Sequence, residues 1–404
     1  MARYGDIYLG GVKGSPSNNT IYNSGVAFCL KDPSPISDVY SFKNEFWEIE
    51  VLKDQPTIVA RSVEILQPDE ILNQGYVICQ KYLDLVSVAK QKNMEIAKPN
   101  ESYVILFKES EEHVLRKVSV IKMISECEFN LPLIKDGKEV PPAPTNLEWI
   151  PAFRYYRLSR LSHDFFDSYL NLFRSFESLL SLIVPPNSSR EKEKDWFLRA
   201  LNEINSKIPL QNYIPSGTPD PVDYFFNEQY KLRTDLFHSK VNRSLLPNDG
   251  LNLQDIADMY EKLFLLWQEI AVQYYNASRI GGSLTCFGFK RGTDGLFGEG
   301  FELVATDDPT VPAVDDTKVS PLNYPIIHFS NLRYENASIP DSVFLIGSLE
   351  GEALRDVSSL HKFCIIKDGH ICVFSGIEEG LFFEGIDKIE CYHGIQLRNN
   401  RLPK

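Results

Sequence analysis

The hydrophobic periodicity of this 404-residue chain changes twice, and this change limits the folds that the chain can adopt. Up to about residue 145, stretches such as 102–108 (SYVILFK) and 114–123 (VLRKVSVIKM) are rich in β-branched and aromatic residues, which is typical of strands. From Trp149, apolar residues recur every three or four positions over more than a hundred residues, which predicts helices. Strand-like stretches return in roughly the last 125 residues.

This order favours an α+β multidomain protein in which a central α-helical bundle is flanked by β-rich N- and C-terminal domains. We expect a β-rich N-terminal domain over residues 1–147, with one helix at 68–90. The helical bundle is expected over residues 148–278, and a β-rich C-terminal domain over 279–404. The stretch 136–151 (DGKEVPPAPTNLEWIP) is rich in proline and indicates a linker between the first two domains.

Four helices are predicted in the central region from the apolar spacing and from the Gly, Pro and Asn residues between them. The first is long, covers 153–184 and stops at a pair of prolines. The others run roughly over 191–207, 223–238 and 253–275. Amphipathic helices joined by such loops most simply form a bundle.

The charge of the chain restricts how it can bind nucleic acid. The formal net charge is −13, and residues 150–276 carry 14 Lys and Arg against 16 Asp and Glu, so most of the excess acidity lies in the flanks. Phosphate binding depends on clustered Lys and Arg, so a constitutive nucleic-acid coat is excluded. A nearly neutral centre still permits a local RNA cleft.

Cysteine usage and hydropathy predict the compartment. Seven cysteines, odd in number and without a CxxC pair, fit reduced thiols better than a disulfide framework or a structural zinc. No apolar signal region follows Met1, and no apolar run approaches the roughly 20 residues that span a bilayer. We therefore expect a cytoplasmic protein with no membrane association.

Four potential metal ligands crowd together near the C-terminus: His361, Cys364, His370 and Cys372. Asp368-Gly369 between two apolar runs suits a two-residue type I′ hairpin turn. The predicted register places Cys364 opposite Val373 and Cys372 opposite Ile365, so that the two sulfurs point to opposite faces. This favours a packed strand pair over a metal site.

Sequence motifs exclude several enzyme classes. The glycine-rich segment 278–300 lacks the GxxxxGK[ST] order of a phosphate-binding loop and is expected to connect the bundle to the C-terminal domain. The chain contains neither GxSxG nor HExxH, which argues against a nucleophile-elbow hydrolase and a zinc protease. We therefore expect no cofactor and no metal.

An arginine followed four to six residues later by a histidine occurs three times, as Arg157–His163, Arg233–His238 and Arg355–His361. Such spacing is expected about once by chance, so the structural context has to select among the pairs. Only the second pair lies near the C-terminal end of the third predicted helix of the bundle.

Ideal helix geometry does not bring the members of this pair together. Five residues turn a helix by about 140°, so Arg233 and His238 share a face only if the helix loosens near Phe237 or the long arginine reaches around the helix end. Alternatively, Arg233 pairs with Asp235 or with an acid on a neighbouring helix, and His238 is a solvated residue at the helix end.

The wider pattern resembles HEPN domains, in particular those of bacterial abortive-infection and phage-defence proteins and of MauJ-like proteins. The resemblance covers about residues 150–276 and includes FRSFESLLSLIV, YKLRTDLFHSK and LQDIADMYEKLFLLWQEIAVQYY in this order. The family pattern is Arg, usually Asn, Asp or His, three further residues, then His. Here Thr234 follows Arg233, and the acidic side chain comes one position later at Asp235.

The resemblance implies a metal-independent endoribonuclease in which the RNA 2′-OH attacks its own phosphate and leaves a 2′,3′-cyclic phosphate and a 5′-OH. His238 would serve as general acid or base and Arg233 would clamp the phosphate, with Thr234 and Asp235 in support. Lys240 and Arg243 are expected to contact RNA phosphates or, equally, to be ordinary surface residues. One histidine does not easily perform both proton transfers, so a homodimer through the bundle is expected.

The leading hypothesis is therefore a defence or toxin ribonuclease that cuts RNA, with tRNA as one candidate, after a phage-derived or partner-protein trigger. The β-rich flanks would act as sensor, regulator or dimer scaffold. The alternative is a non-catalytic HEPN-like binding or assembly module, or a sensor of a defence complex, in which Arg233 and His238 hold a dimer interface or a nucleotide. A third possibility is a target for nucleotide transfer by a partner enzyme, because tyrosines such as Tyr230 lie nearby.

Overall fold

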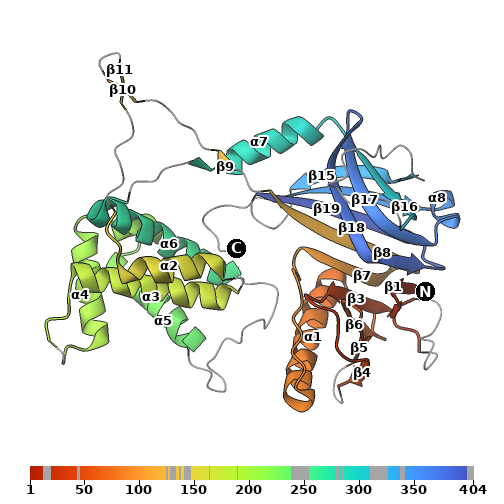
Figure 1. The fold of residues 1–404 in the computed structure, drawn as a ribbon, viewed down its shortest axis with the longest axis horizontal. Coiled ribbons are helices and arrows are strands. Elements are labelled where there is room, and N and C mark those ends of the chain that lie inside the picture. The colour runs from red at the N-terminus through yellow and green to blue at the C-terminus, as the bar shows by residue number, and fades with distance from the viewer. Residues whose placement is uncertain are drawn as a thin grey trace. The chain divides into compact units, whose positions relative to one another are not determined.

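The structure of the chain is a computed structural model (Figure 1), which describes residues 1–11, 20–42, 46–123, 126–127, 133–135, 138–140, 147–162, 164–188, 190–237, 254–277, 282–283, 286–309, 326–336 and 342–397. The chain forms two compact units. The first, the sheet unit, combines Met1–Ile124 with Thr285–Leu397, and the second, the helical unit, is built from Ser125–Leu284. Within the described residues, no helix is both long enough and apolar enough to cross a membrane.

A nine-stranded sheet forms the larger part of the sheet unit. Its strands, in spatial order, are β15 (Ser330–Asn336), β16 (Ser342–Glu350), β19 (Lys388–Leu397), β8 (Glu112–Met123), β7 (Ser102–Glu109), β3 (Ser24–Cys29), β6 (Thr57–Ser62), β5 (Trp47–Val51) and β4 (Asp38–Ser41). Neighbouring strands are antiparallel except β19 and β8, which pair in parallel. This parallel pair joins the N-terminal and C-terminal parts of the chain.

The second large sheet also mixes strands from both parts of the chain. Its order is β14 (Ile327–His328), β13 (Glu302–Thr306), β17 (Ser359–Lys367), β18 (His370–Phe383), β1 (Ala2–Tyr4) and β2 (Ile7–Gly10). It packs on the nine-stranded sheet: the Tyr4 hydroxyl lies 3.3 Å from the Cys29 sulfur, and a Cβ on Gly347 would lie 2.8 Å from Leu303 Cδ2. Close approach of the two sheets therefore requires glycine at position 347.

The predicted fold class, a central helical bundle flanked by two β-rich domains, is wrong. Large sheets dominate a mixed α/β structure, and the N- and C-terminal strands belong to the same sheets. Pairing between strands that are far apart in sequence leaves no local periodicity, so the pattern could not show that both flanks build one unit. The boundaries 1–147, 148–278 and 279–404 remain a prediction.

Helix α1 (Pro68–Lys90) lies against one face of the nine-stranded sheet, over β3, β6 and β7 (Figure 1). Its start is encoded locally by Pro68 in the first turn and by reciprocal hydrogen bonds between Gln67 and Glu70. A Cβ on Gly75 would overlap Val26, so glycine permits the helix to approach the sheet closely. The helix predicted at 68–90 is confirmed. Two shorter helices, α7 (Cys286–Phe297) and α8 (Glu352–Arg355), complete this unit.

The hairpin of β17 and β18 confirms one prediction and corrects another. Asp368 and Gly369 both have positive φ, 50° and 75°, as a type I′ turn requires. Cys364, however, pairs with Phe374 rather than with Val373, because the register shifts between Ile365 and Ile366. A bulge of this kind cannot be read from alternation alone.

The helical unit contains α2 (Pro151–Leu161), α3 (Phe165–Ile183), α4 (Glu193–Asn205), the 3₁₀ turn η1 (Leu210–Tyr213), α5 (Pro221–Phe237) and α6 (Gln254–Tyr275). Short strands β9 (Glu126–Cys127), β10 (Leu133–Lys135), β11 (Lys138–Val140) and β12 (Gly282–Ser283) also belong to the described residues. The long helix predicted at 153–184 is two helices, because Asp164 caps a new helix by accepting from the backbone N–H groups of Phe166 and Asp167. The other three helices lie where they are predicted.

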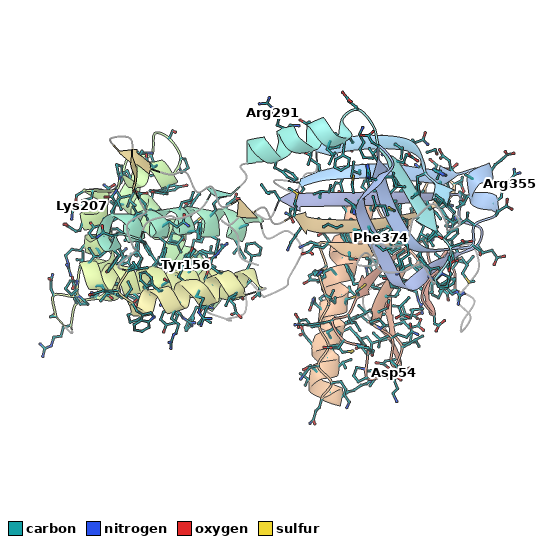
Figure 2. The ribbon with its side chains drawn as sticks, turned by 45° about the horizontal axis from the view of Figure 1, so that its top comes forward. Asp54, Tyr156, Lys207, Arg291, Arg355 and Phe374 are labelled. Atoms are coloured by element: carbon teal, nitrogen blue, oxygen red, sulfur yellow. The ribbon has the colours of Figure 1, made fainter. Side chains whose placement is uncertain are left out.

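Aromatic side chains fill the core of the helical unit. Tyr156 of α2 (labelled in Figure 2) stacks on Trp267 of α6 with ring centroids 4.1 Å apart, and Phe173 of α3 stacks on Phe197 of α4 at 5.7 Å. Such pairs hold helix faces together through large apolar area and favourable ring geometry. The core therefore fixes α3, α4 and α5 relative to one another, which positions the site described below.

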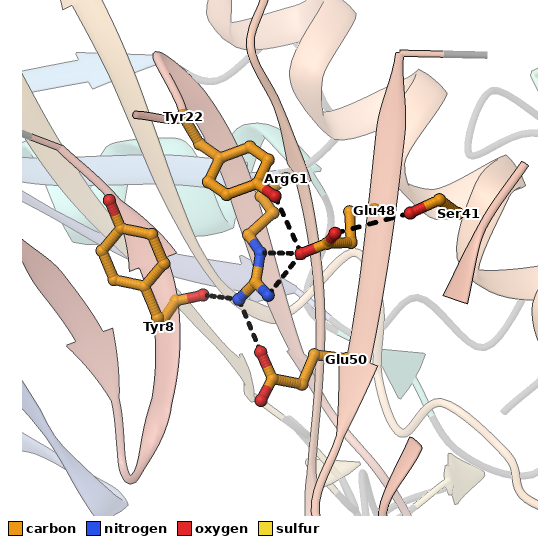
Figure 3. Close-up of polar contacts among 6 residues, drawn as sticks. All are labelled: Tyr8, Tyr22, Ser41, Glu48, Glu50 and Arg61. Carbon is orange, nitrogen blue, oxygen red and sulfur yellow. Dashed lines mark hydrogen bonds and ion pairs between the residues drawn. The ribbon is translucent and has the colours of Figure 1, made fainter. Parts of the chain in front are cut away.

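One buried charge in the sheet unit is fully enclosed by its own partners (Figure 3). Arg61 is 1% exposed, and its guanidinium contacts Glu48 at 2.6 Å, Glu50 at 2.6 Å and the carbonyl of Tyr8 at 2.6 Å. It also lies against the rings of Tyr8 and Tyr22, and the Tyr22 hydroxyl donates to Glu48. Because its donors are engaged, this arginine ties strands together.

Candidate functional site

The described part of the chain contains Arg233, Thr234 and Asp235, in the last turns of α5, whereas His238, Lys240 and Arg243 lie outside the described residues. Helix α5 begins where Asp220 accepts hydrogen bonds from the N–H groups of Val222 and Asp223 at 3.1 and 3.0 Å. The helix thus carries Arg233 to its C-terminal end, three turns from the cap.

Arg233 is held by aromatic rings and by one carboxylate. Its guanidinium carbon lies 5.5 Å from the ring centre of Tyr230, 5.7 Å from that of Phe237 and 5.8 Å from that of Phe173. Its Nη2 atom lies 3.4 Å from Oε1 of Glu193, and a quarter of its side chain remains exposed. The guanidinium is therefore an oriented cation that still reaches solvent.

The sequence allows Arg233 to pair with Asp235 or with an acid on a neighbouring helix, and the structure shows a pair with Glu193 of α4. Glu193 is the first residue of α4 and its side chain is 47% exposed. Thr234 donates its hydroxyl to the carbonyl of Tyr230 at 2.7 Å, four residues back on the same helix. That hydroxyl is thus engaged by the helix backbone in this conformation.

A second carboxyl group lies near this cluster. Glu177 of α3 is half-buried, and the charges of Arg233 and Glu193 both act on its carboxyl group. Burial raises the pKa of Glu177 to about 7; the nearby Arg233 opposes this rise, and Glu193 adds to it. Three helices thus bring one arginine and two carboxyl groups together.

A buried polar bridge lies directly beneath the site. The Tyr169 hydroxyl, on α3, donates toward Gln229 of α5, 2.7 Å from its Oε1 and 2.9 Å from its carbonyl. Gln229 also donates to the carbonyl of Met259 on α6 at 3.3 Å. Burial raises the pKa of Tyr169 well above its usual value, so the phenol keeps the proton that it donates to Gln229. Gln229 lies one turn before Arg233 on α5, so the bridge fixes the position of Arg233 along the axis of α3.

The sequence analysis missed Glu177 and Glu193. Glu177 interrupts the apolar run FRSFESLLSLIV between the buried residues Phe176 and Leu179, and an acid at such a position signals a partner or a raised pKa. Glu193 carries no signal of its own, since acids are common in the first turn of any helix.

Of the other two Arg–His pairs, the structure describes both members of one, Arg355–His361, and these do not form a comparable site. Arg355 lies on α8, is 75% exposed and contacts Glu352, whereas the ring of His361 on β17 packs against Phe382. His163 lies outside the described residues. In the parts of the chain that the structure describes, no three His, Cys, Asp or Glu side chains converge as a metal ion would require.

The sheet unit holds two further polar clusters. A cavity of about 260 Å³ is bordered by Arg333, Lys388 and Glu390, but Glu390 already accepts from Lys388 at 2.9 Å and from Arg116 at 2.8 Å. Its carboxylate is therefore engaged by the protein itself, and its pKa is lowered.

The second cluster lies inside the sheet unit, where Cys391 of β19 pairs with Lys117 of β8. Lys117 is 1% exposed and donates to the Ser102 hydroxyl at 2.8 Å. His393 is fully buried, and within the described residues neither of its ring nitrogens has a hydrogen-bond partner. Burial lowers the pKa of His393 to about 4, and the nearby Lys117 contributes, so the imidazole is neutral.

Comparison with known proteins adds no relative: no family model, curated protein or solved structure matches this chain.

Proposed function

We propose that the helical unit is a metal-independent endoribonuclease of HEPN type, which cuts RNA by 2′-OH attack and leaves a 2′,3′-cyclic phosphate. The observation that carries the proposal is the environment of Arg233: within the described residues it lies against three aromatic rings, is a quarter exposed, and pairs with the half-exposed Glu193 at 3.4 Å. An exposed ion pair of this kind contributes at most about 1 kcal/mol, so an RNA phosphate can displace Glu193 from Arg233.

The chemistry needs a cation for the charge that develops on the phosphoryl oxygens and a group that accepts the proton of the 2′-OH. Arg233 supplies the cation, and its planar guanidinium suits a phosphate. His238, which follows it in the sequence YKLRTDLFHSK, supplies the base. Lys240 and Arg243 add phosphate contacts, and Asp235 and Thr234 support the end of the helix.

The biological setting that we propose is a cytoplasmic defence or toxin effector. RNA, including tRNA, is its substrate, and a phage-derived or partner-protein trigger releases its activity. The helical units of two chains form a homodimer, as the resemblance to HEPN proteins implies. The ion pair of Arg233 with Glu193 supports a resting state in which an acid of the protein occupies the phosphate position.

The test is cleavage of total RNA and of a tRNA pool, both with purified protein in EDTA and after induction in cells that are then infected with phage to supply the trigger. Wild type is compared with Arg233→Ala, with His238→Ala and with Arg190→Ala, an exposed arginine of the same unit that serves as matched control. We expect wild type and Arg190→Ala to cut and to leave cyclic-phosphate ends, and the other two to be inactive. Equal cleavage by all four proteins, or no cleavage by wild type in either setting, contradicts the proposal.

The second candidate function is a non-catalytic assembly module, and the ion pair itself favours it. Arg233 links α5 to α4 through its ion pair with Glu193, and the Thr234 hydroxyl donates a hydrogen bond to the Tyr230 carbonyl of the same helix. Both contacts are of the kind that stabilises a binding surface. In this case Arg233→Ala changes the oligomeric state in light scattering while no variant cuts RNA. Cleavage by wild type decides between the two functions.

A further inference from the structure

The nine-stranded sheet presents one face to the second sheet of its unit, and Lys117 lies on that face. Val104 of β7 pairs with Ala27 of β3 on one side and with Lys117 of β8 on the other, so these three side chains share a face. Cys29 follows Ala27 by two residues and lies on the same face. Its sulfur is 3.3 Å from the Tyr4 hydroxyl of the second sheet. Lys117, which is 1% exposed, is therefore enclosed between the two sheets.

Polar side chains continue this face in the next row of the sheet. Ser119, two residues after Lys117, pairs with Ser102 of β7 and with His393 of β19. The amine of Lys117 donates to the Ser102 hydroxyl at 2.8 Å, so it lies at one end of this row. His393 lies at the other end and is fully buried. Ser102, Lys117, Ser119 and His393 together form what we call the inner polar cluster.

Within the described residues, no carboxylate compensates the lysine of the inner polar cluster. Lys117 forms no ion pair with them, and the side chains whose charge acts on its amine are the thiols of Cys29 and Cys391. Burial raises the pKa of the Cys391 thiol to about 12, so this thiol is neutral. A fully buried lysine is rare in proteins unless an anion pairs with it.

The buried ring of His393 is a second, independent observation. Neither Nδ1 nor Nε2 has a hydrogen-bond partner among the described residues, although buried polar groups ordinarily have one. A water molecule would satisfy these nitrogens, but it carries no charge to offset that of Lys117. The oxygens of an anion accept hydrogen bonds from the lysine amine, from the Ser119 hydroxyl and from an imidazole N–H, and they supply the missing charge.

We propose that the inner polar cluster binds a small oxyanion, a carboxylate or a phosphate, between the two sheets of the sheet unit. Lys117 supplies the positive charge, and Ser119 and His393 donate hydrogen bonds to the oxygens. Ser102 and Cys29 are partly exposed whereas Ser119 and His393 are buried, so the ligand enters from the end of the cluster at β7 and β3. The inference goes beyond the proposed ribonuclease function and does not rest on it, because Arg233 belongs to the other unit.

Calorimetric titration of the whole protein with inorganic phosphate, sulfate and acetate, at an ionic strength held constant with sodium chloride, tests the site. We expect at least one of the three anions to bind, at one site per chain. Lys117→Met keeps the length of the side chain without its charge and should bind that anion about 10-fold or more weakly, because a charge-assisted hydrogen bond is lost. Lys53→Met, at an exposed position of the same unit, is the matched control and should bind as wild type does.

A second measurement locates the anion without altering the lysine. The chain has seven histidines, and binding should shift the imidazole ¹⁵N resonances of His393, which are assigned by their loss in His393→Leu. His370 is exposed in the same unit, and its resonances, assigned in the same way with His370→Leu, should stay unchanged.

Several results would overturn the proposal. If none of the three anions binds to wild type, Lys117 is buried as a neutral amine and the cluster is not an anion site. If the anion binds equally tightly to Lys117→Met, or leaves the resonances of His393 unchanged, it binds elsewhere on the protein. If circular dichroism shows that Lys117→Met does not fold, the resonances of His393 in wild type decide.

Discussion

Nη2 of Arg233, on α5, lies 3.4 Å from Oε1 of Glu193, the first residue of α4. Any anion that binds Arg233 has to displace Glu193, which makes this residue the natural point at which to test the site.

Replacement of Glu193 by glutamine should strengthen RNA binding. The variant loses the anion that competes with phosphate, and an exposed pair of this kind is worth up to about 1 kcal/mol, so we expect affinity to rise about 2- to 5-fold at low salt. Fluorescence anisotropy with a short labelled RNA at two salt concentrations measures this. Glu203→Gln removes the same charge elsewhere on α4 and should change affinity less; weaker binding by Glu193→Gln would contradict the prediction.

The stability of the helical unit should fall as pH rises. The folded pKa of Glu177, about 7, lies above its ordinary value of 4.5, so between these values the folded state holds a proton that the unfolded state has lost. The contribution of Glu177 to the free energy of unfolding is therefore highest below about pH 4.5, and it declines as the pH rises to about 7. In Glu177→Gln this decline should be absent, and at pH 8 we expect a gain on the order of 1–2 kcal/mol after allowance for solvent screening. Urea unfolding followed between pH 4 and pH 8 by circular dichroism provides the measurement, and an unchanged pH dependence in the variant would exclude Glu177 as its source.

The sheet unit should respond to pH in the opposite direction. Its buried His393 has a folded pKa of about 4, below the ordinary 6.5, so the unfolded state takes up the proton first as pH falls. The neutral imidazole makes its full contribution to the free energy of unfolding above about pH 6.5, and this contribution is lost as the pH falls toward 4. His393→Leu cannot take up a proton, and at pH 5 it should exceed wild type by roughly 2 kcal/mol.

Thermal unfolding at pH 7 and pH 5 tests this expectation for His393. His370→Leu, at an exposed position of the same unit, is the matched control and should keep the wild-type dependence. A His393→Leu protein whose melting temperature falls between pH 7 and pH 5 as steeply as that of wild type would contradict it.

Loss of Arg61 should destabilise the sheet unit strongly. Arg61→Met leaves the largely buried carboxylates of Glu48 and Glu50 without their cation, and breaking a buried pair in this way costs about 3–5 kcal/mol. Arg355→Met, at a position that is 75% exposed, should stay within about 0.5 kcal/mol of wild type. The midpoint of urea unfolding reports both effects. A protein with Arg61→Met, Glu48→Gln and Glu50→Gln has neither the cation nor the two anions, and it should regain part of the lost free energy of unfolding. If it regains none, the loss comes from packing and not from charge.

Some features of the site were visible in the sequence and others were not. The position of Arg233 near the C-terminal end of α5 follows from the apolar spacing, which predicts a helix over 223–238. The partner of Arg233 was not visible, because Glu193 lies on another helix. Glu177 could have been noticed as an acid inside an apolar run, but its raised pKa comes first from burial and then from its neighbours, and only the packed structure supplies both.

The sequence by itself determined the local elements: α1 with its cap at Gln67, the type I′ turn at Asp368 and Gly369, and the helices from α4 to α6. Neighbouring residues encode these through periodicity, capping and allowed dihedral angles. Only the tertiary structure decided that β8 and β19 pair in parallel, that the hairpin carries a bulge, and that Glu177, Glu193 and Arg233 meet. Such contacts join segments far apart in the chain, and their free energy comes from burial and charge in the assembled fold, which no local pattern records.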